Sequence, residues 1–348
     1  MNDSRLLINP LDVKQYLKIA YPDRRDIQVV NLTSITSGWE NEMYAFDLQY
    51  GPPDERHQEG LVLRIYPGDD ANEKSLHEFE GIRKLAQAGY PVPQVHLLER
   101  DHSPFERPFL IMERIDGQEM WPALTEGSKS KQYALITQFC DLFLRLHRLD
   151  WRPFVDDPSQ YELNDPYTFI DQWLDRAKYE INRFSKSELL PVVTWLEERR
   201  DTVPCSQPSV VHFDFHPKNI LLRDGGSAVV IDWPGLNVTD ARFDLGWTLL
   251  LTYAYLGKGW LERILREYER LAGGKIERVE FFEVFACVRR LFDVTVSLSE
   301  GAEKLGMRPG AVENMRQQMD AFARVYELLV NLTGIRIEEI DRIVNHAD

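Results

Sequence analysis

A short stretch near the middle of the chain, residues 211–222, gathers side chains that can do chemistry. Asp214 and Asn219 lie in a predicted loop, because the proline between them prevents a helix. Apolar residues after Asn219 predict a strand, the Asp224-Gly225-Gly226 turn reverses it, and a second strand ends at Asp232. This hairpin would bring Asp232 back toward the loop, so that two carboxylates and an amide converge. Hard oxygen ligands of this kind suit a Mg²⁺ ion that carries phosphates.

The order and spacing of these motifs resemble the aminoglycoside phosphotransferase and choline kinase family, which is built on the protein-kinase-like fold. The family's catalytic loop reads roughly His-Gly-Asp-x-His-x-x-Asn, and residues 212–219 read His-Phe-Asp-Phe-His-Pro-Lys-Asn. The family's metal-binding element corresponds to Ile231-Asp232-Trp233, and its downstream acidic element corresponds to residues 240–245. The likeness covers most of the chain, residues 25–330.

The resemblance implies a role for each matching position. Asp214 would be the catalytic residue, which accepts or orients the proton of an acceptor hydroxyl. Asn219 and Asp232 would hold Mg²⁺ against the nucleotide phosphates. The nucleotide-binding positions would be Ser37, Gly38, Arg64, Glu78, Glu113 and Ile115. The first two would start a turn over the phosphates, the next two would form an ion pair, and the last two would offer backbone groups to adenine.

Four positions depart from the family's usual pattern. Arg64 stands where the family usually has lysine, and a planar guanidinium fork is not equivalent to an ammonium group. Phe213 and Lys218 occupy positions that are often glycine, and bulky Trp39 follows Gly38 in the phosphate turn. Lys218 is either a cation near the transferring phosphoryl group or a solvated loop residue.

The surrounding residues predict a β-rich first part and a helical second part. In the stretch Leu61–Tyr66, Leu61, Leu63 and Ile65 share one face and Arg64 lies on the other. Strands are expected at residues 28–36, 43–48, 61–66, 94–98 and 109–112, and helices at 70–88, 131–149, 166–184, 187–201 and along a stripe from 312 to 329. The fold class expected from the resemblance is α+β, a bilobal protein-kinase-like fold with a nucleotide-binding lobe at residues 1–115 and a helical lobe at 116–348 that carries the catalytic loop and the substrate-binding helices.

Composition narrows the classes of partner and compartment. With 348 residues, 43% hydrophobic and 28% charged, the chain can bury a sizeable core in two lobes. A net charge of −15 disfavours nucleic acid and anionic membrane surfaces as partners. Neither a membrane-spanning run nor a signal peptide is visible, which predicts a cytoplasmic protein. Cys140, Cys205 and Cys287 are far apart and are expected to be reduced thiols. The sequence does not indicate an oligomeric state.

The expected function is Mg²⁺-dependent transfer of the γ-phosphate of ATP or GTP to a hydroxyl of a small molecule. Acidic and aromatic side chains between residues 150 and 180 could receive a cationic amino sugar or amino alcohol, or could form a solvated surface: Asp156, Asp157, Tyr161, Glu162, Asp165, Tyr167, Asp171, Trp173 and Asp175.

Two alternatives remain open at this point. One is a metal-dependent hydrolase that uses the His212-x-Asp214-x-His216 cluster. The other is a catalytically impaired nucleotide-binding module, suggested by Arg64 and the poor glycine turn. On the phosphotransferase reading, the two histidines are structural, and Asp244 tethers the catalytic loop or caps a helix.

Overall fold

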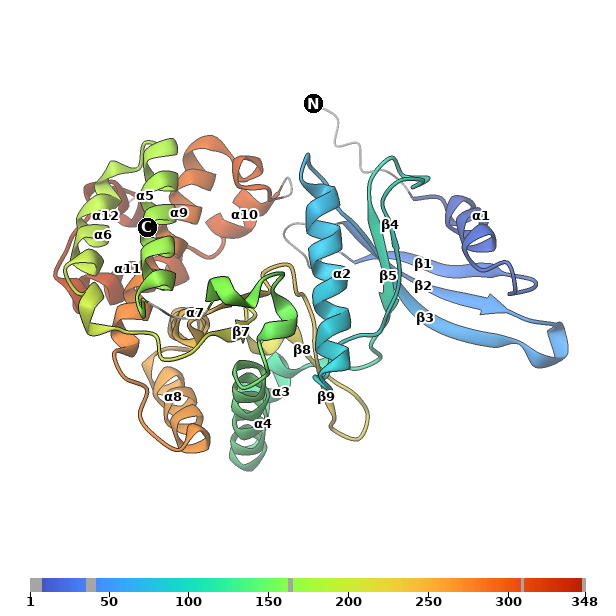
Figure 1. Cartoon of the computed structure of the whole chain (residues 1–348), viewed down its shortest axis with the longest axis horizontal. Coiled ribbons are helices and arrows are strands. Elements are labelled where there is room, and N and C mark those ends of the chain that lie inside the picture. Colours follow the sequence, from blue (N-terminus) through green and yellow to red (C-terminus); the bar gives the residue numbers. More distant parts are fainter. Residues whose placement is uncertain (1–7, 36–41, 162–164, 308–309, 346–348) are drawn as a thin grey trace. The chain divides into compact units, whose positions relative to one another are not determined.

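The computed structural model describes residues 8–35, 42–161, 165–307 and 310–345, and the chain divides into two compact units (Figure 1). The first unit comprises Met1–Gln118 and Leu221–Pro234, and the second comprises Glu119–Ile220 and Gly235–Asp348. The chain therefore enters the second unit after Gln118, returns to the first for one hairpin, and re-enters the second at Gly235.

The first unit is built on an antiparallel sheet with strand order β1-β2-β3-β5-β4. Helix α2 packs against β4 and β5, and α1 packs against β1 (Figure 1). The bounds are α1 Pro10–Ala20, β1 Gln28–Ile35, β2 Glu42–Tyr50, β3 His57–Ile65, α2 Ala71–Gln87, β4 Val95–Glu99 and β5 Phe109–Glu113. The strands and the helix α2 confirm the sequence prediction. Helix α1 was not predicted, although Asn9 caps it and a proline stands at its first position, both of which are start signals.

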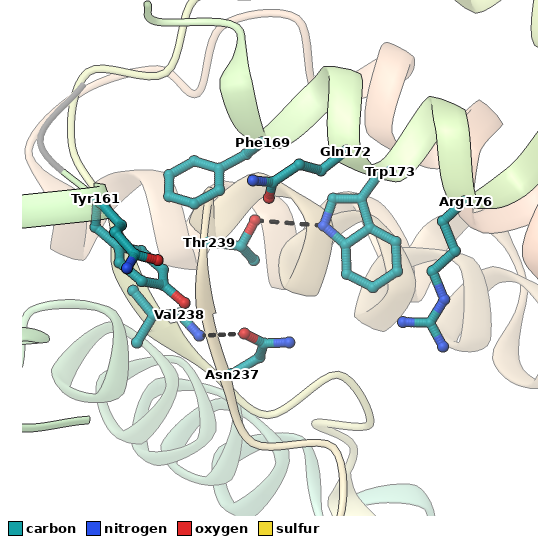
Figure 2. A pocket seen from close by; sticks show the side chains of 9 residues that line it. Tyr161, Phe169, Gln172, Trp173, Arg176, Asn237, Val238 and Thr239 are labelled. Carbon is teal, nitrogen blue, oxygen red and sulfur yellow. Dashed lines mark hydrogen bonds between the residues drawn. The ribbon is translucent and has the colours of Figure 1, made fainter. Parts of the chain in front are cut away.

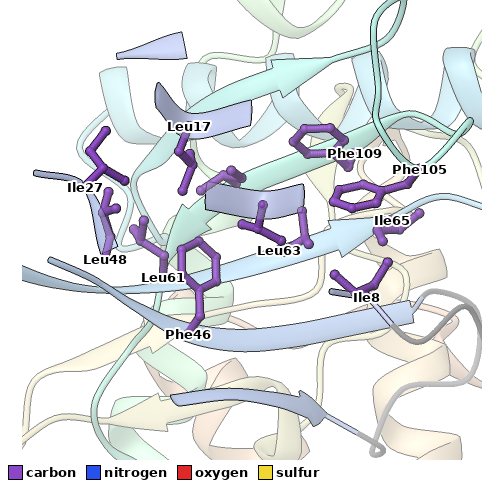
Figure 3. Close-up of a cluster of buried hydrophobic side chains, with 12 residues drawn as sticks. Ile8, Leu17, Ile27, Phe46, Leu48, Leu61, Leu63, Ile65, Phe105 and Phe109 are labelled. Carbon is purple, nitrogen blue, oxygen red and sulfur yellow. The ribbon is translucent and has the colours of Figure 1, made fainter. Parts of the chain in front are cut away.

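Strand alternation divides the side chains of β3 between two environments. Leu61, Leu63 and Ile65 point into a buried apolar cluster with Phe46 and Phe109 (Figure 3). Arg64 lies on the opposite face, as expected from the period of two, and is still only 4% exposed. A buried guanidinium must find charged partners, so the elements that pack on this face of the sheet have to supply carboxylates.

The hairpin of β8 (Ile220–Leu222) and β9 (Ala228–Val230) joins the first unit near the end of α2. The backbone N–H of Val230 donates to the carbonyl of Pro91 at 2.8 Å, and Trp233 packs edge-on against Tyr90 at 5.7 Å between ring centroids. A Cβ on Gly117 would lie 2.5 Å from the carbonyl oxygen of Leu222, so glycine permits this close backbone approach. The predicted division of the chain into lobes at residues 1–115 and 116–348 does not include this return of the chain to the first unit.

The second unit is mainly helical. Helices α7, α9 and α11 pack on one another, and α4 and α7 pack on α8. Strands β7 and β10 form a short antiparallel pair with Val211 opposite Asn237. The bounds are α3 Met120–Glu126, α4 Lys129–His147, α5 Thr168–Arg183, α6 Leu190–Glu197, β7 Ser209–Val211, β10 Asn237–Thr239, α7 Ala241–Leu256, α8 Lys258–Ala272, α9 Val279–Glu300, α10 Ala311–Arg316, α11 Met319–Thr333 and α12 Glu338–Asn345, and β6 (Gln118–Glu119) lies where the two units meet in sequence.

Three further sequence predictions concern the apolar stripe from 312 to 329, the cysteines and membrane-spanning segments. The stripe from 312 to 329 is split between α10 and α11, because the helix is interrupted at Gln317 and Gln318. Cys140, Cys205 and Cys287 are buried free thiols, as predicted. Among the described residues, no helix is both long enough and apolar enough to span a membrane.

Glu283 provides a test of the packing of α9. Burial, reinforced by the charge of Glu280, raises the pKa of Glu283 to about 7 from an ordinary value of 4.5. A carboxyl with a higher pKa in the folded protein binds its proton more tightly there, so its ionisation costs stability as pH rises from about 4.5 through 7. We expect Glu283→Gln to raise the free energy of unfolding by roughly 2–4 kcal/mol at pH 8 and to have little effect at pH 5, measured by denaturant titration. Glu300→Gln, at the exposed end of the same helix, is the control and should leave the free energy of unfolding unchanged at both pH values.

Candidate active site

The catalytic loop predicted at residues 212–219 leaves β7 and enters β8 through a 3-10 turn at Pro217–Asn219. Two backbone amides at its start, those of His212 and Phe213, donate to the two carboxylate oxygens of Asp244 at 2.7 and 2.9 Å. Asp244 is fully buried near the start of α7. The predicted tether is therefore confirmed, and a helix of the second unit fixes where the loop begins.

Phe213 has a φ of +61°, in the left-handed region that favours glycine. Its carbonyl accepts a hydrogen bond from the Arg289 guanidinium at 3.2 Å, and its ring packs edge-on against Trp173 at 5.1 Å. Backbone strain of this kind persists only where the surroundings determine the conformation, and here Asp244 and Arg289 hold the residue from both sides of its peptide.

Asp214 is oriented by its neighbours in the second unit. One carboxylate oxygen accepts from the indole N–H of Trp247 at 3.0 Å. The other lies 3.3 Å from Nε2 of His216 and 3.4 Å from the amide nitrogen of Asn219. The side chain is still 43% exposed, so the carboxylate is held in position and remains accessible.

The same neighbours set the protonation of Asp214. Desolvation alone would raise its pKa, but the charge and hydrogen bond of His216, the Trp247 hydrogen bond and the proximity of His212 together hold the pKa of Asp214 well below its usual range. Asp214 is therefore a carboxylate at every pH at which the protein is expected to work. Such a group can orient a hydroxyl and accept its proton.

In the first unit, Arg64 bridges two carboxylates. Its Nη1 lies 2.9 Å from Glu78 on α2, and its Nη2 lies 2.9 Å from Asp232 at the end of the hairpin. Glu78 is 1% exposed, and it also accepts from the hydroxyl of Tyr66 at 2.6 Å and from the backbone N–H of Trp233. The helix carboxylate thus holds both the strand arginine and the backbone beside Asp232.

Burial and pairing oppose one another in this cluster. Desolvation disfavours the charge on Arg64, yet Glu78 and Asp232 outweigh it and raise the pKa of Arg64 above its ordinary value. Burial raises the pKa of Glu78, an effect that Arg64 and the Tyr66 hydroxyl partly offset. Burial, together with the Glu78 charge, raises the pKa of Tyr66, which keeps its hydroxyl a donor. Asp232 differs from its partners in being 40% exposed.

Comparison with known proteins relates this geometry to a family. A sequence profile described as "Phosphotransferase enzyme family" matches residues 31–282. The chain belongs to this phosphotransferase family. The α+β protein-kinase-like fold expected from the sequence is thereby confirmed, and the reaction class is that of a small-molecule kinase with an alcohol group as acceptor.

Solved structures agree with the fold of this phosphotransferase. A candidate aminoglycoside phosphotransferase from Ralstonia eutropha JMP134 is 17% identical with a TM-score of 0.62, and the match covers 91% of this chain and 98% of that one. The gentamicin complex of APH(2")-IIa is 18% identical with a TM-score of 0.58 and coverages of 93% and 99%. A ternary complex of APH(4)-Ia with ADP and hygromycin B is 18% identical with a TM-score of 0.55 and coverages of 91% and 98%.

The structure bears on the two alternatives. Nδ1 of His212 accepts the backbone N–H of Asp214 at 3.3 Å, and His212 is fully buried, so it anchors the loop as predicted. Among the described residues, no group of three or more His, Cys, Asp or Glu side chains could hold a metal ion. Membership in the phosphotransferase family favours neither the hydrolase alternative nor the impaired module.

The remaining sequence-predicted positions are placed as follows. Glu113 ends β5, where its backbone N–H donates to Gln94 and its side chain pairs with Arg223. Ile115 is buried two residues later. Ser37 and Gly38 lie outside the described residues. Lys218 lies 5.3 Å from the ring centroid of Trp121, a contact within the second unit.

Sequence reasoning missed three residues that contact these groups. Trp247 holds Asp214, and it lies one helical turn after Asp244 on α7, a spacing that could have suggested it. Tyr66 lies two residues after Arg64, the spacing of side chains on one strand face. Arg289 lies over Trp247 at 4.0 Å, and nothing in its local sequence indicates this.

The bridging role of Arg64 can be measured through stability. Arg64→Lys keeps the charge but replaces the two-armed fork with one ammonium group, so one of the two carboxylate hydrogen bonds is lost. We expect the free energy of unfolding to fall by roughly 1–2 kcal/mol, measured by urea titration. Arg83→Lys, at an exposed pair on α2, is the matched control and should change it by less than about 0.5 kcal/mol. Equal stability of wild type and Arg64→Lys would show that the fork is not required.

Proposed function

We propose that the protein transfers the γ-phosphate of ATP or GTP to a hydroxyl of a small molecule in a Mg²⁺-dependent reaction. The observation that carries this proposal is the state of Asp214: an accessible carboxylate, oriented by Trp247 and His216 and kept ionised. In phosphoryl transfer, the protein contributes mainly positioning and charge stabilisation, so an oriented carboxylate beside the acceptor hydroxyl is the required group.

The side chains proposed to bind the metal are Asn219 and Asp232. The amide nitrogen of Asn219 donates to the backbone carbonyl of Asp214 at 3.0 Å, which leaves the amide oxygen as the end suited to a cation. Asp232 presents a 40% exposed carboxylate with one oxygen held by Arg64. Carboxylate and amide oxygens fit Mg²⁺, which when bound neutralises charge on the nucleotide phosphates.

The nucleotide is proposed to contact the first unit. Arg64, held by Glu78, supplies positive charge for phosphate oxygens, and the backbone of Glu113 and Ile115 supplies a carbonyl and an N–H for adenine. Ser37 and Gly38, which lie outside the described residues, complete the proposed set. The cytoplasmic location expected from the sequence agrees with a reaction that consumes ATP or GTP, and it stays a prediction.

The direct test is a transfer assay with γ-labelled nucleotide. Purified protein is incubated with labelled ATP or GTP, Mg²⁺ and a panel of aminoglycosides, choline, macrolides, sugars and homoserine. We expect label to appear on at least one alcohol and EDTA to abolish its appearance. Absence of labelled product with both nucleotides, under conditions in which the protein is folded and binds nucleotide, would refute the proposal.

A further inference from the structure

A pocket of about 230 Å³ lies wholly within the second unit (Figure 2). One wall is a face of α5, from which Phe169, Gln172, Trp173 and Arg176 project at the i, i+3, i+4 and i+7 spacing. The opposite wall is strand β10. Asn237, Val238 and Thr239 come from β10, and Gln160 and Tyr161 complete the described lining.

The two walls are fixed to each other. The indole N–H of Trp173 donates to the hydroxyl of Thr239 at 3.4 Å, as Figure 2 shows. Asn237 accepts the backbone N–H of Val238 at 2.7 Å through its side-chain oxygen, so its amide NH₂ group is left to donate. A pocket built from a helix and a paired strand is preorganised, and its polar groups can select a ligand without being rearranged.

Trp173 also joins this pocket to the catalytic loop. Its ring lies edge-on to Phe213, the residue before Asp214, at 5.1 Å. A smaller recess on the same tryptophan is lined by Phe213, Trp247 and Arg289 among others, and Trp247 is the residue that holds Asp214. A molecule in the pocket therefore shares a wall with the residues that position the proposed base.

The charge of the described lining does not fit the cationic ligand that was one of the two interpretations of the acidic stretch. None of the lining residues that the structure describes is acidic, and Arg176 is the cation among them. Among the nearby carboxylates, Asp171 pairs with Arg200, which also lies 3.5 Å from Asp165, and Asp175 lies within 3.9 Å of Lys178. Asp157 accepts hydrogen bonds from Ser159 and from the lining residue Gln160. Glu162 lies outside the described residues. The described lining itself thus holds no carboxylate for a polycation, and the carboxylate of Asp157 lies behind Gln160.

Arg176 is exposed and is held only loosely. Its guanidinium lies 5.4 Å from the ring centroid of Trp173. In the part of the chain that the structure describes it forms no ion pair, although its charge acts to lower the pKa of Asp293. A guanidinium without a close carboxylate at the edge of a pocket is suited to an anionic group of a ligand, which it can bind through two parallel hydrogen bonds.

Resting on the phosphoryl transfer proposed above, we infer that the acceptor is a compact polyhydroxyl ring that carries a carboxylate. The aromatic side chains Tyr161, Phe169 and Trp173 pack on the apolar face of such a ring, the carboxamides bind its hydroxyls, and Arg176 binds its carboxylate. The pocket of about 230 Å³ has room for one such ring against its described walls.

The reaction of this acceptor balances without a further reactant. The hydroxyl oxygen forms a bond to the γ-phosphorus as the bond from that phosphorus to the β–γ bridging oxygen breaks. The hydroxyl proton passes to Asp214, and the nucleoside diphosphate leaves with the electron pair of the broken bond.

The test compares acceptors that share a ring and differ in charge. Glucuronate and galacturonate are assayed against glucose, galactose, glucosamine and galactosamine, with kanamycin as the polycation, both for phosphorylation and for binding by calorimetry. We expect the acids to bind and react best. Arg176→Gln should lower kcat/KM and affinity for the acids by roughly 10- to 100-fold and leave the neutral sugars unchanged.

Two further variants sharpen the result. Arg183→Gln, an exposed arginine two turns further along α5 that pairs with Glu180, is the matched control and should have no effect. Arg176→Glu should move the preference toward the amino sugars. Preference of the wild type for amines or kanamycin, binding of none of the acids, or an acid preference that survives Arg176→Gln would each overturn the inference. If the proposed phosphoryl transfer fails, calorimetry still shows whether the acids bind best, so failure of the proposed function can be told apart from failure of this inference.

Discussion

Asp214→Asn is expected to lower kcat for phosphoryl transfer by roughly 100- to 10,000-fold while leaving the Kd for nucleotide within about twofold. Asparagine has the shape of aspartate, and its carbonyl oxygen can keep the hydrogen bond from the indole of Trp247. What it loses is the negative charge that takes up the proton of the acceptor hydroxyl. A selective loss of kcat is the signature of a group that acts in the transition state and not in binding.

Two comparisons make this result interpretable. Asp141→Asn removes an exposed carboxylate on α4 in the same unit and should leave kcat unchanged. Asp214→Ala should be as inactive as Asp214→Asn, but less stable, because it leaves the Trp247 N–H without its acceptor. If Asp214→Asn retains near wild-type kcat in single-turnover measurements, Asp214 is not the base.

The local geometry of β3 and α2 in the first unit could be predicted from simple periodicities. The period of two in β3 separated Arg64 from Leu63 and Ile65, and the spacing of apolar residues along α2 placed Glu78 on its inward face. The alternation in β3 and the inward face of α2 are set by local backbone geometry, so sequence alone is sufficient to find them.

Long-range contacts account for most of what was missed. Trp247 reaches Asp214 because Asp244 on the same helix holds the loop, and Arg289 reaches Phe213 from α9, 76 residues away in sequence. The acidic residues between 150 and 180 suggested a cationic ligand, but their partners, such as Arg200 for Asp171, could not be known before the fold was. Residue type and spacing do not reveal which charges are already neutralised.

Phe213 illustrates how a departure from a family pattern can be read once the structure is known. Glycine is usual at this position, and the φ of +61° explains the preference. A phenylalanine is tolerated because its ring gains contact with Trp173 while Asp244 and Arg289 hold its peptide. The aromatic ring therefore ties the catalytic loop to a lining residue of the pocket, a link that glycine could not make.

Asp232→Asn is expected to reduce phosphoryl transfer by roughly 100- to 1,000-fold and to remove most of the Mg²⁺ dependence of nucleotide binding. The carboxylate is shared: Arg64 holds one oxygen at 2.9 Å, and the exposed remainder is the proposed metal ligand. The amide oxygen of asparagine can still accept from Arg64, so the variant tests the charge rather than the bridge.

The readouts for Asp232 separate metal binding from folding. Nucleotide Kd is measured by calorimetry at several Mg²⁺ concentrations, and wild type should bind more tightly as Mg²⁺ rises, whereas Asp232→Asn should respond weakly. Asp224→Asn, in the exposed turn of the same hairpin, is the control and should behave as wild type. Because Asp232 is 40% exposed and keeps an acceptor for Arg64, we expect a stability change below about 1 kcal/mol, so inactivity cannot be attributed to unfolding. If nucleotide binding by Asp232→Asn responds to Mg²⁺ as strongly as wild type does, Asp232 is not a metal ligand. The structural role of Asn219 would then be its hydrogen bond to Asp214.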